Sequence, residues 1–452
     1  MTRSFPYRLS RRQALAGIAA SMVWRPGFSD TVPVHSPAES DGGPVFSSGG
    51  PDAELYGAAE GFPILDPSLS FHPLNPTKPK YRVGAFSHLD AIFKTREIAR
   101  ATTPWRFKRA PLDIQYSYGG TSSALTDYLA RNPVTGLLIA KDDQILFEHY
   151  QYGRTDRDRM ASQSMAKSIV GVLIGIAISE GAIQSIDDTP ERYVPGFKGT
   201  EYGTTPIRDL LHMSSGVEFG EEADNDRDLD RLAFDLMGGY VGMYGKAKWA
   251  PSLAAFLGTA KGTVASIVQF NRRIAPPGTR YFYASIEVDV LGMVLRHAVG
   301  KSVSEYLHDK IWEPIGAEAD ASWLIDAQGF EVAYGFFNAV LRDYARLGRL
   351  LAHDGAWDGK QIIPAQWMID ATTVRASDAF LAPGKAQDPA FGYGYLLWLL
   401  PSGKRQFALF GNYGQRICVD PASKLIMVHT SVEGKTEIWR LWSALVKQFG
   451  RP

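Results

Sequence analysis

The sequence predicts an α+β protein built on an antiparallel β-sheet, which is flanked by N- and C-terminal helices and carries an inserted all-helical lobe. Three features of the 452-residue chain point to this fold. Two strand-like runs lie at residues 136–150, a helix that is apolar on nearly every face follows at 164–180, and three strands and a last helix occupy 407–449. Strands at both ends of the folded part, with helices between them, are typical of such a layered arrangement.

The first residues have the pattern of an export signal. The pair Arg11-Arg12 precedes a short apolar stretch at residues 14–23, as in a twin-arginine signal. The alternative is an ordinary basic N-terminal helix. We assign the signal to residues 1–30 and expect a periplasmic or secreted protein.

A composition change separates this signal from the folded part. Residues 31–85 are rich in Pro, Gly and Ser, which predicts a linker or a segment that wraps the surface. The domain itself is expected at residues 86–450, with its helical lobe inserted at about 165–280. A hydrophobic content of 45% is ample for a core of this size.

The folded part begins with a β-hairpin at residues 136–150. The apolar runs 137–140 and 145–147 flank a polar turn. The helix at 164–180 follows, and Gly181 can supply its left-handed cap. Because this helix has apolar residues on nearly every face, we expect it to be buried at the centre of the domain.

Residues 185–280 contain short helical segments and irregular stretches. The run 221–231 is charged and is expected to be exposed. The glycine- and tyrosine-rich run 238–245 suits a loop over a cleft, and a variable surface loop is an equally good interpretation. Helical spacing resumes at 286–298 and ends at Gly300.

The C-terminal part is expected to be a meander of strands at 407–410, 416–420 and 425–430, covered by a helix at 437–449. The single cysteine, Cys418, lies in the second of these strands and excludes an internal disulfide. We interpret it as a buried apolar residue rather than a reactive thiol.

The composition excludes several functional classes. Lys+Arg and Asp+Glu both number 48, so the formal net charge is zero and nothing points to nucleic acid or an anionic membrane. No apolar run reaches the length of a membrane-spanning helix. The nine histidines show no H-x-x-x-H or H-E-x-x-H spacing, so we predict no metal and no cofactor.

The central helix opens with Ser164-Met165-Ala166-Lys167, an S-x-x-K motif. Residues three apart lie on one face of a helix, so the lysine can reach the serine hydroxyl. A serine becomes a nucleophile when a base takes its proton, and a lysine can be that base when apolar surroundings lower its pKa. The backbone N–H of a serine at a helix start can also stabilise an oxyanion. The alternative is that Ser164 is a plain N-cap and Lys167 is solvated.

Two further segments could complete a catalytic site. Tyr283 ends a turn just before the helix at 286–298, and a tyrosine beside a lysine can relay a proton. The segment 411–415, Gly-Asn-Tyr-Gly-Gln, opens a strand with small residues that let a substrate approach the backbone. Taken alone, Tyr283 fits a core or rim position, and the second segment fits a glycine-rich turn.

These three motifs, in this order, resemble the serine β-lactamase and penicillin-binding-protein superfamily. The segments 187–195 and 210–216 also resemble patterns of that superfamily. The resemblance implies a β-lactamase/transpeptidase-like fold and a serine hydrolase. The residues that it implies are catalytic Ser164, Lys167 and Tyr283, an oxyanion contact from Asn412, a proton path through Ser285, and substrate contacts from Tyr413, Gly414 and Gln415.

Within the superfamily the chain resembles the 6-aminohexanoate-dimer hydrolases, which are amidases with esterase activity. The shared details include Y-x-S at Tyr283 and the runs 289–291 and 342–349. The resemblance implies hydrolysis of a small amide or ester through a serine acyl-enzyme. Those hydrolases have histidine where Tyr413 stands and asparagine where Glu287 stands, so we expect the chemistry of the pocket to differ.

The alternatives are a β-lactamase, a D-alanyl-D-alanine carboxypeptidase, and a binding or sensor module of the same fold without turnover. Asn412-Tyr413-Gly414 replaces the K-T-G of β-lactamases, so the cation that grips a β-lactam carboxylate is missing there. If another cation takes its place, Arg342 and Arg346 are the first candidates. A module without turnover is expected to lack one of the three catalytic residues, and all three are present.

Overall fold

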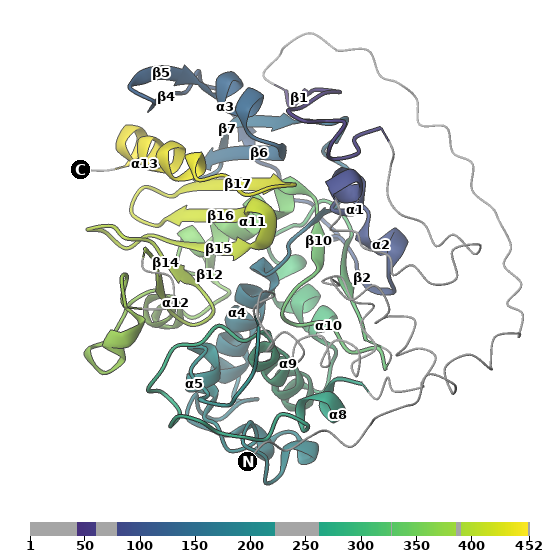
Figure 1. The fold of residues 1–452 in the computed structure, drawn as a ribbon, viewed down its shortest axis with the longest axis vertical. Coiled ribbons are helices and arrows are strands. Elements are labelled where there is room, and N and C mark those ends of the chain that lie inside the picture. Colours follow the sequence, from purple (N-terminus) through teal and green to yellow (C-terminus); the bar gives the residue numbers. More distant parts are fainter. Residues whose placement is uncertain (1–42, 60–78, 222–261, 327, 386–389, 451–452) are drawn as a thin grey trace, which may run out of the picture. The chain divides into compact units, whose positions relative to one another are not determined.

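A nine-stranded sheet forms the body of the protein, whose computed structural model describes residues 43–59, 79–221, 262–326, 328–385 and 390–450 (Figure 1). The central strands pair antiparallel, which confirms the predicted hairpin and meander. Two short edge strands instead run parallel to β7. In sheet order the strands are β1 (Val45–Phe46), β7 (Gln144–Tyr150), β6 (Val134–Lys141), β17 (Leu425–Ser431), β16 (Gln415–Asp420), β15 (Phe407–Gly411), β14 (Trp398–Leu399) and β13 (Gly392–Tyr393), and β3 (Lys108–Arg109) also pairs with β7.

Helices lie before, between and after these strands. The α-helices are α1 (Arg82–Ala85), α2 (Leu89–Ile92), α3 (Leu125–Arg131), α4 (Met165–Ser179), α5 (Ile207–Leu211), α8 (Thr263–Ile267), α9 (Ser285–Val299), α10 (Val303–Leu307), α11 (Leu341–Ala352), α12 (Ala365–Ala371) and α13 (Glu437–Phe449). Shorter helical turns are η1 (Pro79–Tyr81), η2 (Pro190–Arg192), η3 (Pro195–Phe197), η4 (His308–Trp312), η5 (Ala376–Leu381) and η6 (Asn412–Gly414). Among the described residues, no helix has both the length and the apolar character needed to cross a bilayer.

Alternating side chains divide the sheet between two cores. On one face Leu138 and Val428 join the core that contains α4, α9 and α11. On the other face Leu137 and Met427 pack with α3 and α13. This period of two is what a strand buried on both faces requires. The prediction that the helix at 437–449 covers the sheet is confirmed, whereas the opposite face is covered by helices of the insertion.

The inserted part is longer and more varied than predicted. It runs from the end of β7 to β13 and, besides helices, includes three strands of a second sheet, whose fourth strand precedes β6 in the sequence. The α+β fold with an inserted lobe is confirmed, but strands of two to four residues are too short to show alternation in the sequence. The second sheet has the order β2 (Thr95–Ile98), β9 (Ala321–Leu324), β10 (Phe337–Ala339) and β8 (Met160–Ala161), and two hairpins consist of β4 (Gln115–Tyr118) with β5 (Thr121–Ala124) and β11 (Ala356–Trp357) with β12 (Lys360–Gln361).

The helix α4 has the central position that its sequence predicts. Every residue from Met165 to Ala177 is buried, and Gly181 follows with a positive φ of 74°. The helix packs against α9 and against β15 and β16. The ring of Trp367 lies so near that a Cβ on Gly175 would stand 2.4 Å from it. The first turn of α4 is therefore held firmly in the core.

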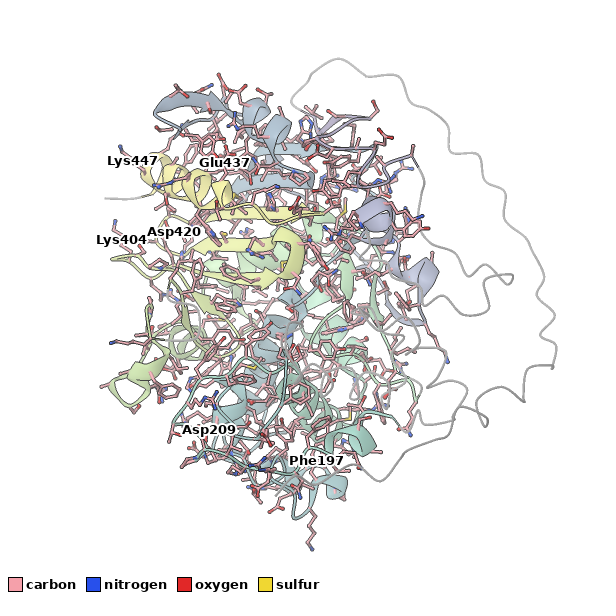
Figure 2. All side chains as sticks on the ribbon, in the orientation of Figure 1. Phe197, Asp209, Lys404, Asp420, Glu437 and Lys447 are labelled. Carbon is pink, nitrogen blue, oxygen red and sulfur yellow. The ribbon has the colours of Figure 1, made fainter. Side chains whose placement is uncertain are left out.

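A buried carboxylate fixes the start of α13 (Figure 2). Glu437 is 5% exposed, and its side chain accepts hydrogen bonds from Arg131 at 2.7 Å, from Asn132 at 3.0 Å and from the hydroxyl of Tyr116. A buried carboxylate is stable when its oxygens are fully hydrogen-bonded in this way. These contacts tie the last helix to α3 and to β4.

Part of the segment 31–85 lies within the described residues. There it adds β1 to the sheet and buries Tyr56, which is 2% exposed, so it packs on the body as a wrapping segment would. The predicted signal at 1–30 and the run 238–245 lie outside the described residues, as does most of the run 221–231.

The packing of α13 on the sheet can be tested through Cys418. This thiol is completely buried between the sheet and α13, and burial raises its pKa to about 12. Because the thiolate is the reactive form, we expect native protein at pH 8 to react with Ellman's reagent at least about a hundred times more slowly than unfolded protein. One thiol per chain should react in guanidinium chloride. Rapid reaction of the native thiol would contradict this packing.

Candidate active site

Ser164 and Lys167 meet at the first turn of α4. The Nζ of Lys167 donates hydrogen bonds to Ser164 Oγ at 3.2 Å and to the backbone carbonyl of Tyr334 at 2.8 Å. Ser164 is half-buried, whereas Lys167 is only 2% exposed. The Ser164 hydroxyl makes no capping hydrogen bond to the helix. The alternative of a plain N-cap with a solvated lysine is therefore wrong.

The backbone just before α4 presents Ser164 at the end of a tight turn. Gln163 has a positive φ of 47°, in the left-handed region that non-glycine residues seldom adopt. The turn is closed by a hydrogen bond from the Met165 N–H to the Ser162 carbonyl at 3.1 Å, and the Ser162 hydroxyl donates to the Gln163 carbonyl at 2.8 Å. Such local strain costs roughly 1–3 kcal/mol and is typical of functional sites.

Tyr283 stands beside this pair, directly before α9. The Nζ of Lys167 lies 4.9 Å from the centre of the Tyr283 ring and 5.2 Å from that of Tyr334. The Tyr283 ring also packs against Trp398 and Tyr393, with centroid distances of 5.9 and 6.3 Å. The structure thus places Lys167 against both the serine and the tyrosine that the motifs select.

The segment 411–415 approaches Ser164 from the end of β15. Gly411 lies so close to the backbone that a Cβ there would stand 2.3 Å from the Ser162 carbonyl oxygen. Asn412–Gly414 then form the turn between β15 and β16, in which Asn412 is exposed and Tyr413 has a positive φ of 62°. The turn that the resemblance selects is therefore next to the nucleophile.

The side chain of Gln415 has a different role from the predicted substrate contact. Its Nε2 donates to the Ser431 carbonyl at 2.6 Å and to the Asn412 carbonyl at 3.2 Å, and its Oε1 accepts from the Ser431 N–H at 3.1 Å. Gly414 is buried against Ser431. Both residues shape the turn, because these contacts bind it to β17.

Tyr413 also faces protein rather than open space. Its ring packs against Phe86 with a centroid distance of 5.1 Å, and the Arg82 guanidinium lies 4.6 Å above it. No local pattern predicts these partners, because they come from a segment that precedes the turn by more than three hundred residues.

Ser285 is engaged by a carboxylate that the sequence analysis did not select. Its backbone N–H and its hydroxyl donate to the two oxygens of Glu221, at 2.9 and 2.5 Å. Ser285 is 1% exposed and is the first residue of α9. The proton path predicted through Ser285 therefore leads toward Glu221. In the sequence, Glu221 was one of several acidic residues in a charged run.

Glu287 lies in the core rather than at a surface that a substrate reaches. It is 2% exposed, and its Oε1 accepts a hydrogen bond from the Ser215 hydroxyl at 2.6 Å. Burial raises the pKa of this carboxyl well above its ordinary value. The Glu287 carboxyl is therefore enclosed by protein and paired with Ser215, and its predicted effect on the chemistry of the pocket stays a prediction.

The two arginines proposed as substitutes for a K-T-G cation are already paired. Arg342 contacts Glu148 at 2.8 Å, and Arg346, which is 1% exposed on its side chain, contacts Glu318 at 2.8 Å. Both belong to ion-pair networks on α11. The charge of each guanidinium is therefore already balanced by carboxylates of the protein.

A cation nearer to the turn is Arg416 on β16. Its guanidinium donates to the backbone carbonyls of Gly411 and Gln415, the latter at 2.7 Å, and stacks 4.3 Å from the centre of the Phe410 ring. It also interacts electrostatically with Tyr283, and burial lowers its pKa to about 10. Arg416 could not be selected from the sequence, since nothing in a strand pattern marks its side chain as facing the turn.

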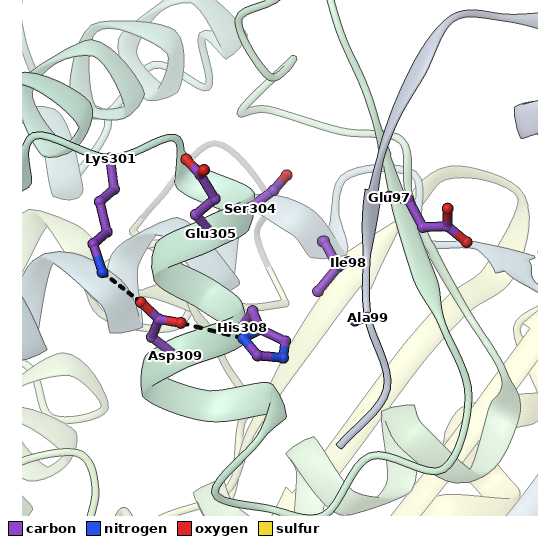
Figure 3. A pocket seen from close by; sticks show the side chains of 8 residues that line it. All are labelled: Glu97, Ile98, Ala99, Lys301, Ser304, Glu305, His308 and Asp309. Atoms are coloured by element: carbon purple, nitrogen blue, oxygen red, sulfur yellow. Dashed lines mark hydrogen bonds and ion pairs between the residues drawn. The ribbon is translucent and has the colours of Figure 1, made fainter. Parts of the chain in front are cut away.

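A separate pocket of about 360 Å³ lies away from these residues (Figure 3). Its charged groups pair with one another, as in the contacts of Asp309 with Lys301 at 2.7 Å and with His308 at 3.2 Å. None of the predicted site residues lines it. Within the described part of the chain, no cluster of three or more potential metal ligands occurs.

Residues 122–437 match the Beta-lactamase family model. The 6-aminohexanoate-dimer hydrolase of Paenarthrobacter ureafaciens is 24% identical over 391 residues, which cover 85% of this chain and 92% of the relative.

Solved structures show the same fold. A Bacillus anthracis protein assigned as a 6-aminohexanoate-dimer hydrolase is similar with a TM-score of 0.72 and 23% identity, over 84% of this chain and 96% of that protein. The hydrolase EstCE1, which has promiscuous acyltransferase activity, is similar with a TM-score of 0.51 and 16% identity, over 72% and 96% of the two chains.

The contact at Gly411 should be essential to the geometry of the site. Gly411→Ala places a Cβ 2.3 Å from the Ser162 carbonyl oxygen, so β15 or the turn before Ser164 must move. We expect kcat/KM for p-nitrophenyl butyrate to fall about a hundredfold, as displacements near 1 Å can cause. Gly403→Ala is the matched control, because a Cβ at Gly403 has no atom within 4 Å. Equal activity of the two variants would show that the contact is unimportant.

Proposed function

The chain belongs to the Beta-lactamase family, and we propose that it hydrolyses a small amide or ester through an acyl-enzyme on Ser164. The observation that carries this proposal is the 3.2 Å hydrogen bond between Lys167 Nζ and Ser164 Oγ, made by a lysine that is almost fully buried. A buried lysine gives up its proton more readily than a solvated one, as a general base must. The overall likeness to a 6-aminohexanoate-dimer hydrolase supports an amidase or esterase rather than another chemistry.

Acylation begins at the serine hydroxyl. Lys167 as the neutral amine accepts the proton of Ser164 while Oγ attacks the substrate carbonyl carbon. The negative charge moves to the carbonyl oxygen, which accepts hydrogen bonds from the backbone N–H groups of Ser164 and Asn412. This pairing is supported by the close approach of Gly411, the neighbour of Asn412, to Ser162 and Gln163, which directly precede Ser164.

The tetrahedral intermediate collapses when the bond to the leaving amine or alcohol breaks. Tyr283, which adjoins the Lys167 ammonium, gives the leaving group its proton and regains one from Lys167. Water then attacks the acyl-enzyme by the same route in reverse, which frees the acid and restores Ser164. Ser285 and Glu221 hold the first turn of α9 just behind Tyr283.

Other activities of this fold have less support. A β-lactamase or a D-alanyl-D-alanine carboxypeptidase needs a cation for the substrate carboxylate, whereas Asn412 and Tyr413 are uncharged. Arg342 and Arg346 are ion-paired, and the Arg416 guanidinium is engaged by the backbone carbonyls of Gly411 and Gln415. A non-catalytic module has no need for a lysine buried beside a serine. We further propose that the 6-aminohexanoate dimer is a substrate to test, since a named relative is a hydrolase of that dimer.

Short neutral esters should be better substrates than β-lactams. We expect measurable hydrolysis of p-nitrophenyl acetate and butyrate, its loss in Ser164→Ala, and little turnover of nitrocefin. A hydrogen bond to a charged group is worth about 1.5–3 kcal/mol, so a missing cation weakens carboxylate binding about ten- to a hundredfold. Nitrocefin and the esters are compared by kcat/KM with the same preparation. If nitrocefin is the far better substrate, another cation grips it and the β-lactamase alternative replaces this one.

We also propose that the protein is exported through the twin-arginine route. The support is the Arg11-Arg12 pair ahead of a short apolar stretch. Replacing both arginines with lysine should leave precursor in the cytoplasm, as measured by immunoblots of cell fractions. Ser164→Ala with its native signal is the control, because it should be exported normally. Undiminished enzyme in the periplasm of the double-lysine variant would rule the route out.

A further inference from the structure

The segment before the family-matched region contacts both sides of the active site. The family match begins at residue 122, whereas Phe86 lies well before it. The backbone carbonyl of Phe86 accepts a hydrogen bond from the Ala161 N–H at 2.7 Å, three residues ahead of Ser164. Its ring, which is 4% exposed, packs 5.1 Å from the ring of Tyr413. One residue therefore touches the strand that leads to the nucleophile and the turn that carries Asn412.

Tyr413 needs such support because its backbone is strained. A tyrosine at φ 62° lies in the left-handed region, where a Cβ is unfavourable. The Arg82 guanidinium lies 4.6 Å above the Tyr413 ring and donates to the Val432 carbonyl at 3.2 Å. The ring is thus held between Phe86 and Arg82, while Arg82 is itself fixed to the end of β17.

The N-terminal segment that carries Phe86 is also anchored to the residues that follow β17. The hydroxyl of Tyr56 donates to the Glu433 carboxylate, and the Tyr56 carbonyl accepts the Val83 N–H at 3.3 Å. These contacts fix the position of α1 relative to β17. Phe86, which caps the end of α1, is consequently a rigid spacer rather than a loosely packed side chain.

We propose that Phe86 and Arg82 are positioning residues, which hold Tyr413 so that the Asn412 and Ser164 backbone N–H groups form one oxyanion site. This inference rests on the proposed hydrolase function. It assigns a catalytic consequence to a segment outside the part of the chain that matches the family. A purely structural role predicts lower stability alone, whereas a positioning role predicts a lower kcat at an unchanged KM.

The test is a double-mutant cycle between Phe86 and Tyr413. Phe86→Leu removes the ring but keeps an apolar side chain, and Tyr413→Gly removes the other ring at a backbone angle that glycine accepts. We expect each change to lower kcat for p-nitrophenyl butyrate about tenfold, with KM within about twofold. The double variant should fall no further than Tyr413→Gly, because the two residues act through one contact. Losses that multiply in the double variant would overturn the proposal.

Phe107→Leu is the matched control. Phe107 is also an aromatic residue ahead of the family match, although it is half-buried where Phe86 is buried. Its ring packs against Trp105, with a centroid distance of 4.8 Å, and within the described part of the chain its ring contacts include none of the predicted catalytic residues. The Phe107→Leu variant should have a lower free energy of unfolding and an unchanged kcat. If Phe86→Leu behaves in the same way, Phe86 is a packing residue only. If Phe86→Leu does not fold, Arg82→Met leaves Phe86 in place and should lower kcat about threefold, and an unchanged kcat would overturn the proposal.

A phosphonate ester separates failure of this inference from failure of the proposed function. Such a compound phosphonylates an active serine and resembles the transition state, so its rate depends on the oxyanion site. The native protein should be labelled at Ser164 and Phe86→Leu labelled about tenfold more slowly. Equal labelling rates would contradict the positioning role and leave the hydrolase function standing. Failure to label the native protein would remove the function itself.

Discussion

The site depends on the close approach of Gly411 to the Ser162 carbonyl and to the Cβ of Gln163. It joins the start of a helix to a hairpin turn about 250 residues later in the chain, and it requires a residue without a side chain at position 411. Left-handed residues stand on both sides of it, Gln163 before the nucleophile and Tyr413 in the turn. Neither conformation is stable by itself, so each relies on the packing of its neighbours. The burial of α4 and the hydrogen bonds of Gln415 to β17 supply that packing.

Local patterns in the sequence predict the parts of the fold that are long and regular. The hairpin, α4, α9, the meander and α13 each extend over enough residues for a period of two or of 3.6 to emerge. The spacing of Ser164 and Lys167 follows from helix geometry alone, and the structure joins them as predicted. The β2–β9–β10–β8 sheet could not be predicted, because strands such as Met160–Ala161 are too short for any period.

The site residues that the sequence did not reveal are those defined by long-range contacts. Glu221 accepts a hydrogen bond from the first residue of α9, although it lies 64 residues earlier in the chain, and Phe86 of the N-terminal segment packs against Tyr413. The place of Gln415 in the motif predicts a substrate contact. The Gln415 amide instead hydrogen-bonds to backbone groups of the turn and of β17. Motif position identifies which backbone lies at a site, whereas the direction of each side chain depends on partners elsewhere in the chain.

The complete burial of Cys418 bears on how the protein responds to the redox conditions around it. The chain has one cysteine, so no bridge within the molecule contributes to its stability. The thiol is enclosed by the sheet and α13, out of reach of glutathione or a second chain. In the native state this thiol is therefore protected from oxidation. Redox poise, which governs the folding of many extracellular proteins, therefore cannot act on this fold through an internal disulfide.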